Sequence, residues 1–473
     1  MSEDIPQFTV GALTRAYVDG ELTPHTVVEE VIDRIGSDDH NAWITIFAKS
    51  ELFERADELA NITNIDLEQK PLYGVPYAIK DNIDAAEEST TAACPEYAYT
   101  PETNATVVDR IESAGAILIG KTNLDQFATG LVGTRSPYGA CHNAIDPEYI
   151  SGGSSSGSAV AVADSQVAFT LGTDTGGSGR VPPSFNGIIG QKPTRGALSN
   201  NGVVPACRTL DCVSVFANTC RDALLVEQVA AGYDPADEYS RQAVDEQSLG
   251  LQEATDSLTI GIPSQNQLEF FGDSEASTLF EDTRELVTSV ANEALTVDIS
   301  SLLECSNLLF DGPWVAERLI PTRDVRTKHS EALVPVLEEI LEGAETLSAV
   351  DVFEAQYHRK QLKKEVETLF ETINALIVPT TGTIYTIDEI NQKPIERNSN
   401  LGLYTNFVNL LDLAATTVPV GRRENGLPFG VTIIGEAFSD GMLAGIGDAL
   451  CQELNVTVGA AEYEYTELKN PTI

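Results

Sequence analysis

The chain has 473 residues, of which 72 are Asp or Glu and 29 are Lys or Arg, so its formal net charge is −43. This balance excludes direct nucleic-acid binding through a basic face, because such a face must displace counterions from phosphates. The hydrophobic content of 42% is too high for a disordered acidic chain. The length also allows a large core. The sequence therefore predicts a globular protein with an unusually anionic surface.

The acidic residues are spread along the whole chain, and lysine is scarcer than arginine. Surfaces of this kind suit proteins that stay hydrated and soluble in molar salt, where self-repulsion is screened. We interpret the chain as a cytoplasmic protein of a halophile, with an acidic mesophilic protein as the alternative. The N-terminus lacks the regions of a signal peptide, and no apolar run approaches the roughly 18 residues of a membrane span. We expect no membrane association.

The first half of the chain alternates helix and strand patterns. Thr23 as N-cap and Pro24 in the first turn begin an amphipathic helix that ends at Ile35. The elements predicted next are a helix over 50–60, a strand over 75–80, a helix over 106–113 and a strand over 116–119. Gly115 at the turn between the last two is typical of a helix-to-strand unit.

The centre of the chain, residues 150–202, is rich in Gly and Ser and poor in charge, which predicts burial. Residues 241–257 are polar and acidic without an apolar period, which predicts an exposed connection. The elements predicted after it are a strand over 258–262, a helix over 275–293, strands over 296–299 and 375–379, a helix over 403–413, strands over 416–419 and 430–434, and a helix ending near 454. Together they predict one large α/β domain over residues 1–473.

The seven cysteines and five histidines form no metal-binding pattern. The cysteines are odd in number, scattered and without a C-x-x-C pair, so we expect buried, reduced thiols and neither disulfides nor zinc. The histidines lie outside any glycine-rich turn and are interpreted as surface or core residues. Residues 153–157 match G-x-S-x-G, but no buried strand of the kind that a nucleophile elbow requires precedes them.

Three segments remain as candidates for Ser/Lys chemistry: GVPYAIKDNID around Lys80, SGGSSSGSA around Ser154 and GTDTGGSGR around Ser178. Lys80 ends an apolar strand, so either a carboxylate neutralises it or burial lowers its pKa toward neutrality. A neutral lysine acts as a general base. The small residues before Ser178 allow backbone N–H groups to converge on a developing oxyanion. Each segment alone is equally compatible with a structural role, such as a buried Lys–carboxylate pair or a plain Gly-rich turn.

Taken together, the three segments resemble the amidase signature family over roughly residues 71–192. The resemblance implies the family's α/β fold, in which helices cover both faces of a large mixed central sheet. It also implies a catalytic triad of Lys80, Ser154 and Ser178, with a cis peptide bond at Ser154 and Ser178 as nucleophile. The other implied site residues are the oxyanion-hole N–H groups of Thr175, Gly176, Gly177 and Ser178 and the supporting side chains of Ser155, Asp174 and Arg180.

Longer words are similar to the allophanate hydrolases within this family, over roughly residues 71–450. They include PLYGVPYAIKDNID, GPWVAER and LGLYTNFVNLLDLAATTVPVG. The resemblance implies release of ammonia from allophanate through an acyl-enzyme, with neither a metal nor an organic cofactor. Arg318 is implied to hold the substrate carboxylate through two parallel hydrogen bonds, and Gly130 to contact the substrate through its backbone.

Two departures from the allophanate hydrolases stand out. These enzymes usually carry a Tyr eight residues before the carboxylate-binding Arg, and this chain has Phe310 there. Loss of one hydrogen bond to a charged group weakens binding by about 1.5–3 kcal/mol. Many members also continue into a domain that processes the carboxylated product, whereas this sequence ends at Ile473.

Other functions stay open. The chain is also compatible with an amidase for another small carboxylated or aliphatic amide, with an amidotransferase of the tRNA-dependent kind, whose amidase component needs tRNA and a partner protein, or with a non-catalytic binding protein. The residues after Ser178 are Gly-Arg-Val-Pro, where the amidase components of these amidotransferases typically have Ile-Arg-Gln-Pro. The resemblance links the chain functionally to a biotin-dependent urea carboxylase. The sequence leaves the oligomeric state open, a homodimer included.

Overall fold

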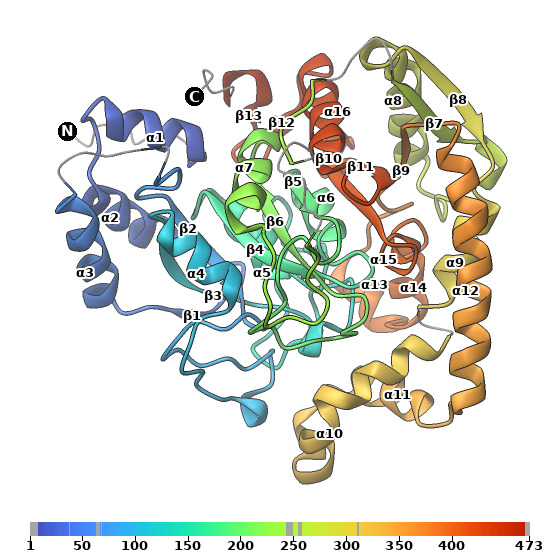
Figure 1. Cartoon of the computed structure of the whole chain (residues 1–473), viewed down its shortest axis with the longest axis horizontal. Helices are drawn as coiled ribbons and strands as arrows, with labels where there is room; N and C mark the ends of the chain where they lie inside the picture. Colours follow the sequence, from blue (N-terminus) through green and yellow to red (C-terminus); the bar gives the residue numbers. More distant parts are fainter. Residues whose placement is uncertain are drawn as a thin grey trace.

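A single large sheet forms the centre of the protein (Figure 1). The computed structural model describes residues 8–36, 38–62, 67, 69–242, 249–253, 258–309 and 312–468. Within these residues the sheet has 11 strands in the order β1-β3-β2-β4-β6-β5-β10-β11-β9-β7-β8. The strands are β1 Trp43–Ile46, β2 Pro76–Lys80, β3 Ile117–Thr122, β4 Phe169–Asp174, β5 Ile189–Lys192, β6 Cys212–Ala217, β7 Thr259–Pro263, β8 Glu293–Val297, β9 Ala375–Pro379, β10 Leu413–Arg422 and β11 Pro428–Glu436; β12 Thr457–Val458 and β13 Tyr463–Glu464 form a separate pair.

Parallel and antiparallel pairs are both present, so the sheet is mixed, as predicted. Strand β2 lies between β3 and β4 and is parallel to both, and β7 is parallel to β8 and β9. The strands between these two groups pair antiparallel. Because parallel strands end at the same edge of a sheet, the carboxyl ends of β2 and β4 bring Lys80 and Asp174 to one edge.

Helices cover both faces of the sheet, as predicted. Helices α4, α7, α16 and α8 contact one another in that order, whereas α5 packs against α6 and against strands β2, β3, β4 and β6. The helices are α1 Val10–Val18, α2 Pro24–Ile35, α3 Lys49–Ala60, α4 Thr106–Ser113, α5 Ser156–Ala163, α6 Val181–Asn186, α7 Cys220–Ala230, α8 Ser274–Val290, α9 Ser300–Asn307, α10 Leu319–Lys328, α11 Pro335–Ala344, α12 Ala349–Phe370, α13 Ile387–Gln392, α14 Glu396–Leu401, α15 Asn406–Leu410 and α16 Asp440–Glu453.

Local sequence signals placed several elements correctly. Helix α2 has the predicted bounds, and the Thr23 hydroxyl accepts a hydrogen bond from the Thr26 N–H at 3.2 Å. Helix α4 and strand β9 also match their predicted ranges. The Gly- and Ser-rich stretch 150–202 is almost entirely buried, as predicted. All eight residues of α5 are buried, because their small side chains allow close packing against the sheet.

Three predictions need correction. The helix predicted to reach residue 293 ends at Val290, because Glu293 already pairs with β7 as the first residue of β8. The helix predicted over 403–413 shortens to α15, because β10 begins at Leu413 and pairs with both β5 and β11. In the predicted exposed connection, residues 243–248 and 254–257 lie outside the described residues, and Leu249 is buried rather than exposed.

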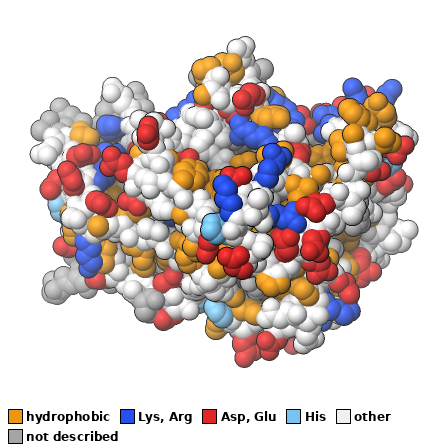
Figure 2. All heavy atoms as spheres, turned by 90° about the horizontal axis from the view of Figure 1, so that it is seen from below, with side chains coloured by type: hydrophobic (Ala, Val, Ile, Leu, Met, Phe, Trp, Pro, Cys, Tyr) orange, Lys and Arg blue, Asp and Glu red, His pale blue; other side chains and the backbone are white. Residues whose placement is uncertain are grey.

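The surface carries many acidic side chains. Figure 2 shows Asp and Glu side chains over much of one face, with a group of Lys and Arg side chains near its middle. Within the described ranges, no helix is both long and apolar enough to cross a bilayer.

Candidate active site

Lys80 is the last residue of β2, and all five residues of that strand are buried. Its Nζ lies 2.8 Å from the Oγ of Ser154 and 2.7 Å from the Oγ1 of Thr173. Burial lowers the pKa of Lys80 to about 7, although the more distant carboxylate of Asp125 opposes the change. Lys80 is therefore in a position to exchange a proton with Ser154 near neutral pH.

Ser154 connects Lys80 to Ser178. The Ser154 Oγ lies 2.9 Å from the Ser178 Oγ. The peptide bond between Gly153 and Ser154 is cis, as the family resemblance implied. Both serines are buried, with Ser178 3% exposed. The structure thus brings the three predicted triad residues into one hydrogen-bonded row, in the predicted order.

Asp125 holds the segment that carries Ser154. Its carboxylate accepts the backbone N–H groups of Val132, Gly133 and Arg135 at 2.9–3.1 Å. Its own N–H donates to the carbonyl of Ser154 at 3.0 Å. A Cβ on the neighbouring Gly153 would lie 2.0 Å from the Asp125 carboxylate, so only glycine fits there. The sequence analysis missed Asp125, because its partners are neighbours only in the folded chain.

Asp174 and Arg180 brace the turn that carries Ser178. The Asp174 carboxylate accepts the N–H groups of Gly177 at 2.8 Å and Gly179 at 2.9 Å. It also receives two hydrogen bonds from the Arg180 guanidinium, at 2.8 and 2.9 Å. Although burial opposes ionisation, Arg180 holds the pKa of Asp174 below its usual value. Both residues therefore occupy the supporting positions that the resemblance implied.

Ser155 supports the site from the other side. Its Oγ donates to the carbonyl of Thr173 at 3.0 Å and accepts the Thr173 N–H at 3.2 Å. Because the Thr173 hydroxyl contacts Lys80, these bonds fix one of the two direct polar partners of the lysine.

The predicted oxyanion hole is only partly available. The Gly177 N–H already donates to Asp174, so its assignment to the oxyanion hole is wrong in this structure. In the described part of the chain, the N–H groups of Thr175, Gly176 and Ser178 have no protein acceptor. A Cβ on Gly176 would lie 2.2 Å from Leu309, so this turn requires glycine.

Arg318 lies beside the loop that contains Gly130. It ends the 3₁₀ helix η4, Pro313–Arg318, and is 2% exposed. Its guanidinium donates to the Thr129 hydroxyl at 2.8 Å and more weakly to the Ala128 carbonyl at 3.4 Å. The structure therefore brings Arg318 and Gly130 together, whereas Phe310 lies outside the described residues.

A second buried arginine flanks the same loop and was not predicted. Arg135 donates to the carbonyls of Thr129 at 3.0 Å and Pro394 at 2.7 Å. Burial lowers its pKa, so the Thr129 loop lies between two buried guanidinium groups. A basic residue in the word ATGLVGTRSP was the only signal in the sequence.

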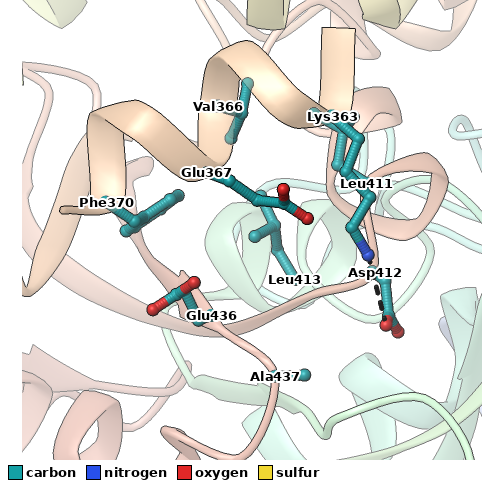
Figure 3. A pocket seen from close by; sticks show the side chains of 9 residues that line it. All are labelled: Lys363, Val366, Glu367, Phe370, Leu411, Asp412, Leu413, Glu436 and Ala437. Atoms are coloured by element: carbon teal, nitrogen blue, oxygen red, sulfur yellow. Dashed lines mark ion pairs between the residues drawn. The ribbon is translucent and has the colours of Figure 1, made fainter. Parts of the chain in front are cut away.

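Two further features lie away from these residues. All seven cysteines are buried free thiols. Among the residues that the structure describes, no group of three or more His, Cys, Asp or Glu side chains could hold a metal ion. A pocket of about 240 Å³ lies between α12 and the segments around residues 411–413 and 436–437 (Figure 3). The Lys363–Asp412 ion pair at 3.6 Å lies on its wall, and no predicted site residue lines it.

Comparison with known proteins identifies the family. The family model described as Amidase matches residues 26–444. The chain belongs to the amidase family. Urea amidolyase of Saccharomyces cerevisiae is 44% identical over 417 residues, which are 88% of this chain and 22% of that protein. The chain thus spans about a fifth of the length of this relative.

Relatives of matching length point to two groups. The structure of selenomethionine-substituted Kluyveromyces lactis allophanate hydrolase is 40% identical, with a TM-score of 0.88, over 98% of this chain and 75% of that chain. The amidase component of glutamyl-tRNA(Gln) amidotransferase from Natranaerobius thermophilus is 32% identical over 96% of this chain and 97% of that protein. The predicted resemblance to allophanate hydrolases is confirmed, and this family member is a hydrolase of amide C–N bonds.

Proposed function

We propose that the protein releases ammonia from allophanate through an acyl-enzyme formed on Ser178. The observation that carries the proposal is the buried row from Lys80 through Ser154 to Ser178, with contacts of 2.8 and 2.9 Å. A lysine with a pKa near 7 is largely neutral at slightly alkaline pH and then accepts a proton. Its similarity to Kluyveromyces lactis allophanate hydrolase supports the choice of substrate.

The reaction begins with attack of the Ser178 Oγ on the amide carbon. The Ser178 proton passes to Ser154, whose own proton passes to Lys80. The N–H groups of Gly176 and Ser178, with that of Thr175, stabilise the oxyanion. As the tetrahedral intermediate collapses, the C–N bond breaks and the proton returns through Ser154 to the leaving ammonia. Water then hydrolyses the acyl-enzyme by the same relay.

Arg318 supplies the fixed cation that an anionic substrate needs. A formal charge of −43 makes most of the protein surface unfavourable for an anion, so recognition depends on a local guanidinium. Arg318 is buried beside Gly130, where charged hydrogen bonds are strong. We propose that it binds the allophanate carboxylate while the terminal amide faces Ser178.

The test is ammonia release by the purified protein in molar KCl. Allophanate is compared with malonamate, glutamine and an uncharged aliphatic amide, and Ser178→Ala serves as control. We expect release from allophanate that is lost in Ser178→Ala. Arg318→Met should raise KM for allophanate by about 10- to 150-fold, the range expected for one hydrogen bond between charged groups, and leave the uncharged amide unaffected. Preference for another amide in the wild-type protein would overturn the choice of substrate.

The amidase component of a tRNA-dependent amidotransferase is the second candidate, because the Natranaerobius thermophilus relative matches this chain over nearly its full length. It predicts glutamine-dependent ammonia release that appears only when a partner protein is added. Release from allophanate by the isolated chain would favour the first candidate.

The setting of the reaction is a further part of the proposal. The acidic composition supports function in a salt-rich cytoplasm. Similarity to proteins named urea amidolyase supports a functional link to a biotin-dependent urea carboxylase that supplies the substrate. Whether the protein forms a homodimer can be measured by light scattering in the same KCl buffer.

A further inference from the structure

The loop 206–211, which leads into β6, contacts both halves of the candidate site. On one side, Asp211 accepts a hydrogen bond from the Thr175 hydroxyl at 2.5 Å. The same carboxylate accepts the N–H groups of Ala206 at 2.8 Å and Cys207 at 3.1 Å. Asp211 is 4% exposed, so these bonds form in a dry environment, where they are strong. The loop is thus tied to the turn that carries the nucleophile.

On its other side, the loop is tied to η4, which ends at Arg318. The Glu317 carboxylate accepts both the hydroxyl and the N–H of Thr209, the latter at 3.1 Å. The Cys207 thiol donates to the Trp314 carbonyl at 3.4 Å. Arg195 donates to the carbonyl of Thr209 and fixes it from behind.

Neighbouring side chains on a helix point in different directions, so Glu317 is not placed to pair with Arg318. Its bonds instead fix the last turn of η4, and with it the backbone from which the Arg318 side chain projects. A displacement of about 1 Å in a group that holds the substrate is enough to lower the rate strongly. The anchor on Thr209 therefore acts on the position of Arg318.

We propose that loop 206–211 positions the two halves of the site separately. Asp211 positions the oxyanion turn through Thr175, and the Thr209–Glu317 pair positions Arg318. Both are positioning residues, since neither touches the substrate. The second half of this inference rests on the proposed binding of a substrate carboxylate by Arg318. It makes Thr209 and Glu317 determinants of selectivity for carboxylated amides.

The two contacts predict different kinetic effects. Thr209→Val removes one bond to Glu317 and should raise KM for allophanate about tenfold, with kcat and the KM for an uncharged amide unchanged. Thr175→Val removes the bond to Asp211 and should lower kcat at least tenfold for both substrates. Thr175→Ser keeps a hydroxyl and should restore kcat. Thr327→Val, the same exchange on the exposed face of α10, is the matched control and should match the wild type.

A double-mutant cycle separates positioning from loss of structure. Thr209→Val and Glu317→Ala should be non-additive in KM for allophanate, because each removes the same contact. Additive effects, or equal effects on the uncharged amide, would overturn the assignment to Thr209 and Glu317. If Thr209→Val does not fold by circular dichroism, Glu317→Gln, which keeps one acceptor for Thr209, gives the same test with a smaller rise in KM.

The outcomes also separate this inference from the proposed function. If the wild-type protein shows no preference for allophanate, or Arg318→Met leaves KM unchanged, the proposed function fails. If both hold and Thr209→Val has the kinetics of the wild type, only the role of the loop fails.

Discussion

Lys80 and Lys121 are both fully buried near the ends of adjacent parallel strands, β2 and β3, yet their surroundings differ. The direct polar contacts of the Lys80 Nζ in the described chain are the hydroxyls of Ser154 and Thr173. The Lys121 Nζ lies 3.1 Å from the carboxylate of Asp81, with a hydroxyl and a carbonyl as further partners.

This difference separates a structural lysine from one suited to catalysis. Burial lowers the pKa of both, but at Lys121 the attached carboxylate of Asp81 opposes the change directly. Lys121 is therefore held as a charged partner within the fold. Among the described residues, Lys80 has only uncharged groups in contact, so the energetic difference between its two protonation states is small near pH 7.

Replacing Lys80 should have the largest effect on activity. In Lys80→Met we expect ammonia release to fall by about 10⁴-fold or more, because no other base in the described chain reaches Ser154. Folding should persist, since an apolar chain replaces an amine without a carboxylate in contact. Ammonia release and thermal unfolding, measured in the same buffer, test both statements. Activity above one hundredth of the wild type would contradict the role of Lys80.

Replacing Lys121 should instead act on stability. Lys121→Met leaves Asp81 buried without its cation, which should lower the free energy of unfolding by about 3–5 kcal/mol. The double variant Asp81→Asn/Lys121→Met should recover part of this loss. Denaturant titration followed by circular dichroism measures it. If Lys121→Met is as stable as the wild type, the contrast with Lys80 does not hold.

The pH dependence of activity tests the pKa of Lys80. The neutral amine is the base, so kcat/KM should rise tenfold per pH unit below about 7 and level off above it. Thr173→Val removes an acceptor that favours the charged amine, so it should move the midpoint to lower pH. Steady-state rates from pH 5.5 to 9 at constant KCl give both curves. A midpoint that Thr173→Val leaves in place would argue against Lys80 as the titrating group.

A buried carboxyl offers the smallest test of the same principle. Burial, with the nearby Asp440, raises the pKa of Glu227 well above its usual value. The folded state therefore holds this proton more tightly than the unfolded state, and the associated stability is lost as pH rises. Glu227→Gln keeps an acceptor for Gln191, so it should raise the melting temperature at pH 8 by roughly 1–2 °C and change little at pH 5. An equal shift at both pH values would contradict this assignment.

The sequence identified most of the candidate site because its residues lie in short, specific words. Lys80, Ser154 and Ser178 were predicted from three such words, and Asp174 and Arg180 from their place beside the nucleophile. It missed Asp125, Thr173 and Asp211, whose hydrogen-bond partners come mainly from other segments. It also assigned Gly177 to the oxyanion hole, because a motif does not show that Asp174 already accepts that N–H.

The same division holds for the fold. The sequence by itself determined the bounds of α2 and α4 and the burial of the Gly-rich centre, because caps and packing of small residues depend on neighbours in the chain. Only the tertiary structure decided where β8 begins, since pairing with β7 overrides helix periodicity. It also decided the chemistry of Lys80, whose two contacts lie 74 and 93 residues away in the chain. A pKa depends on such distant neighbours and on burial, and neither is written in the local sequence.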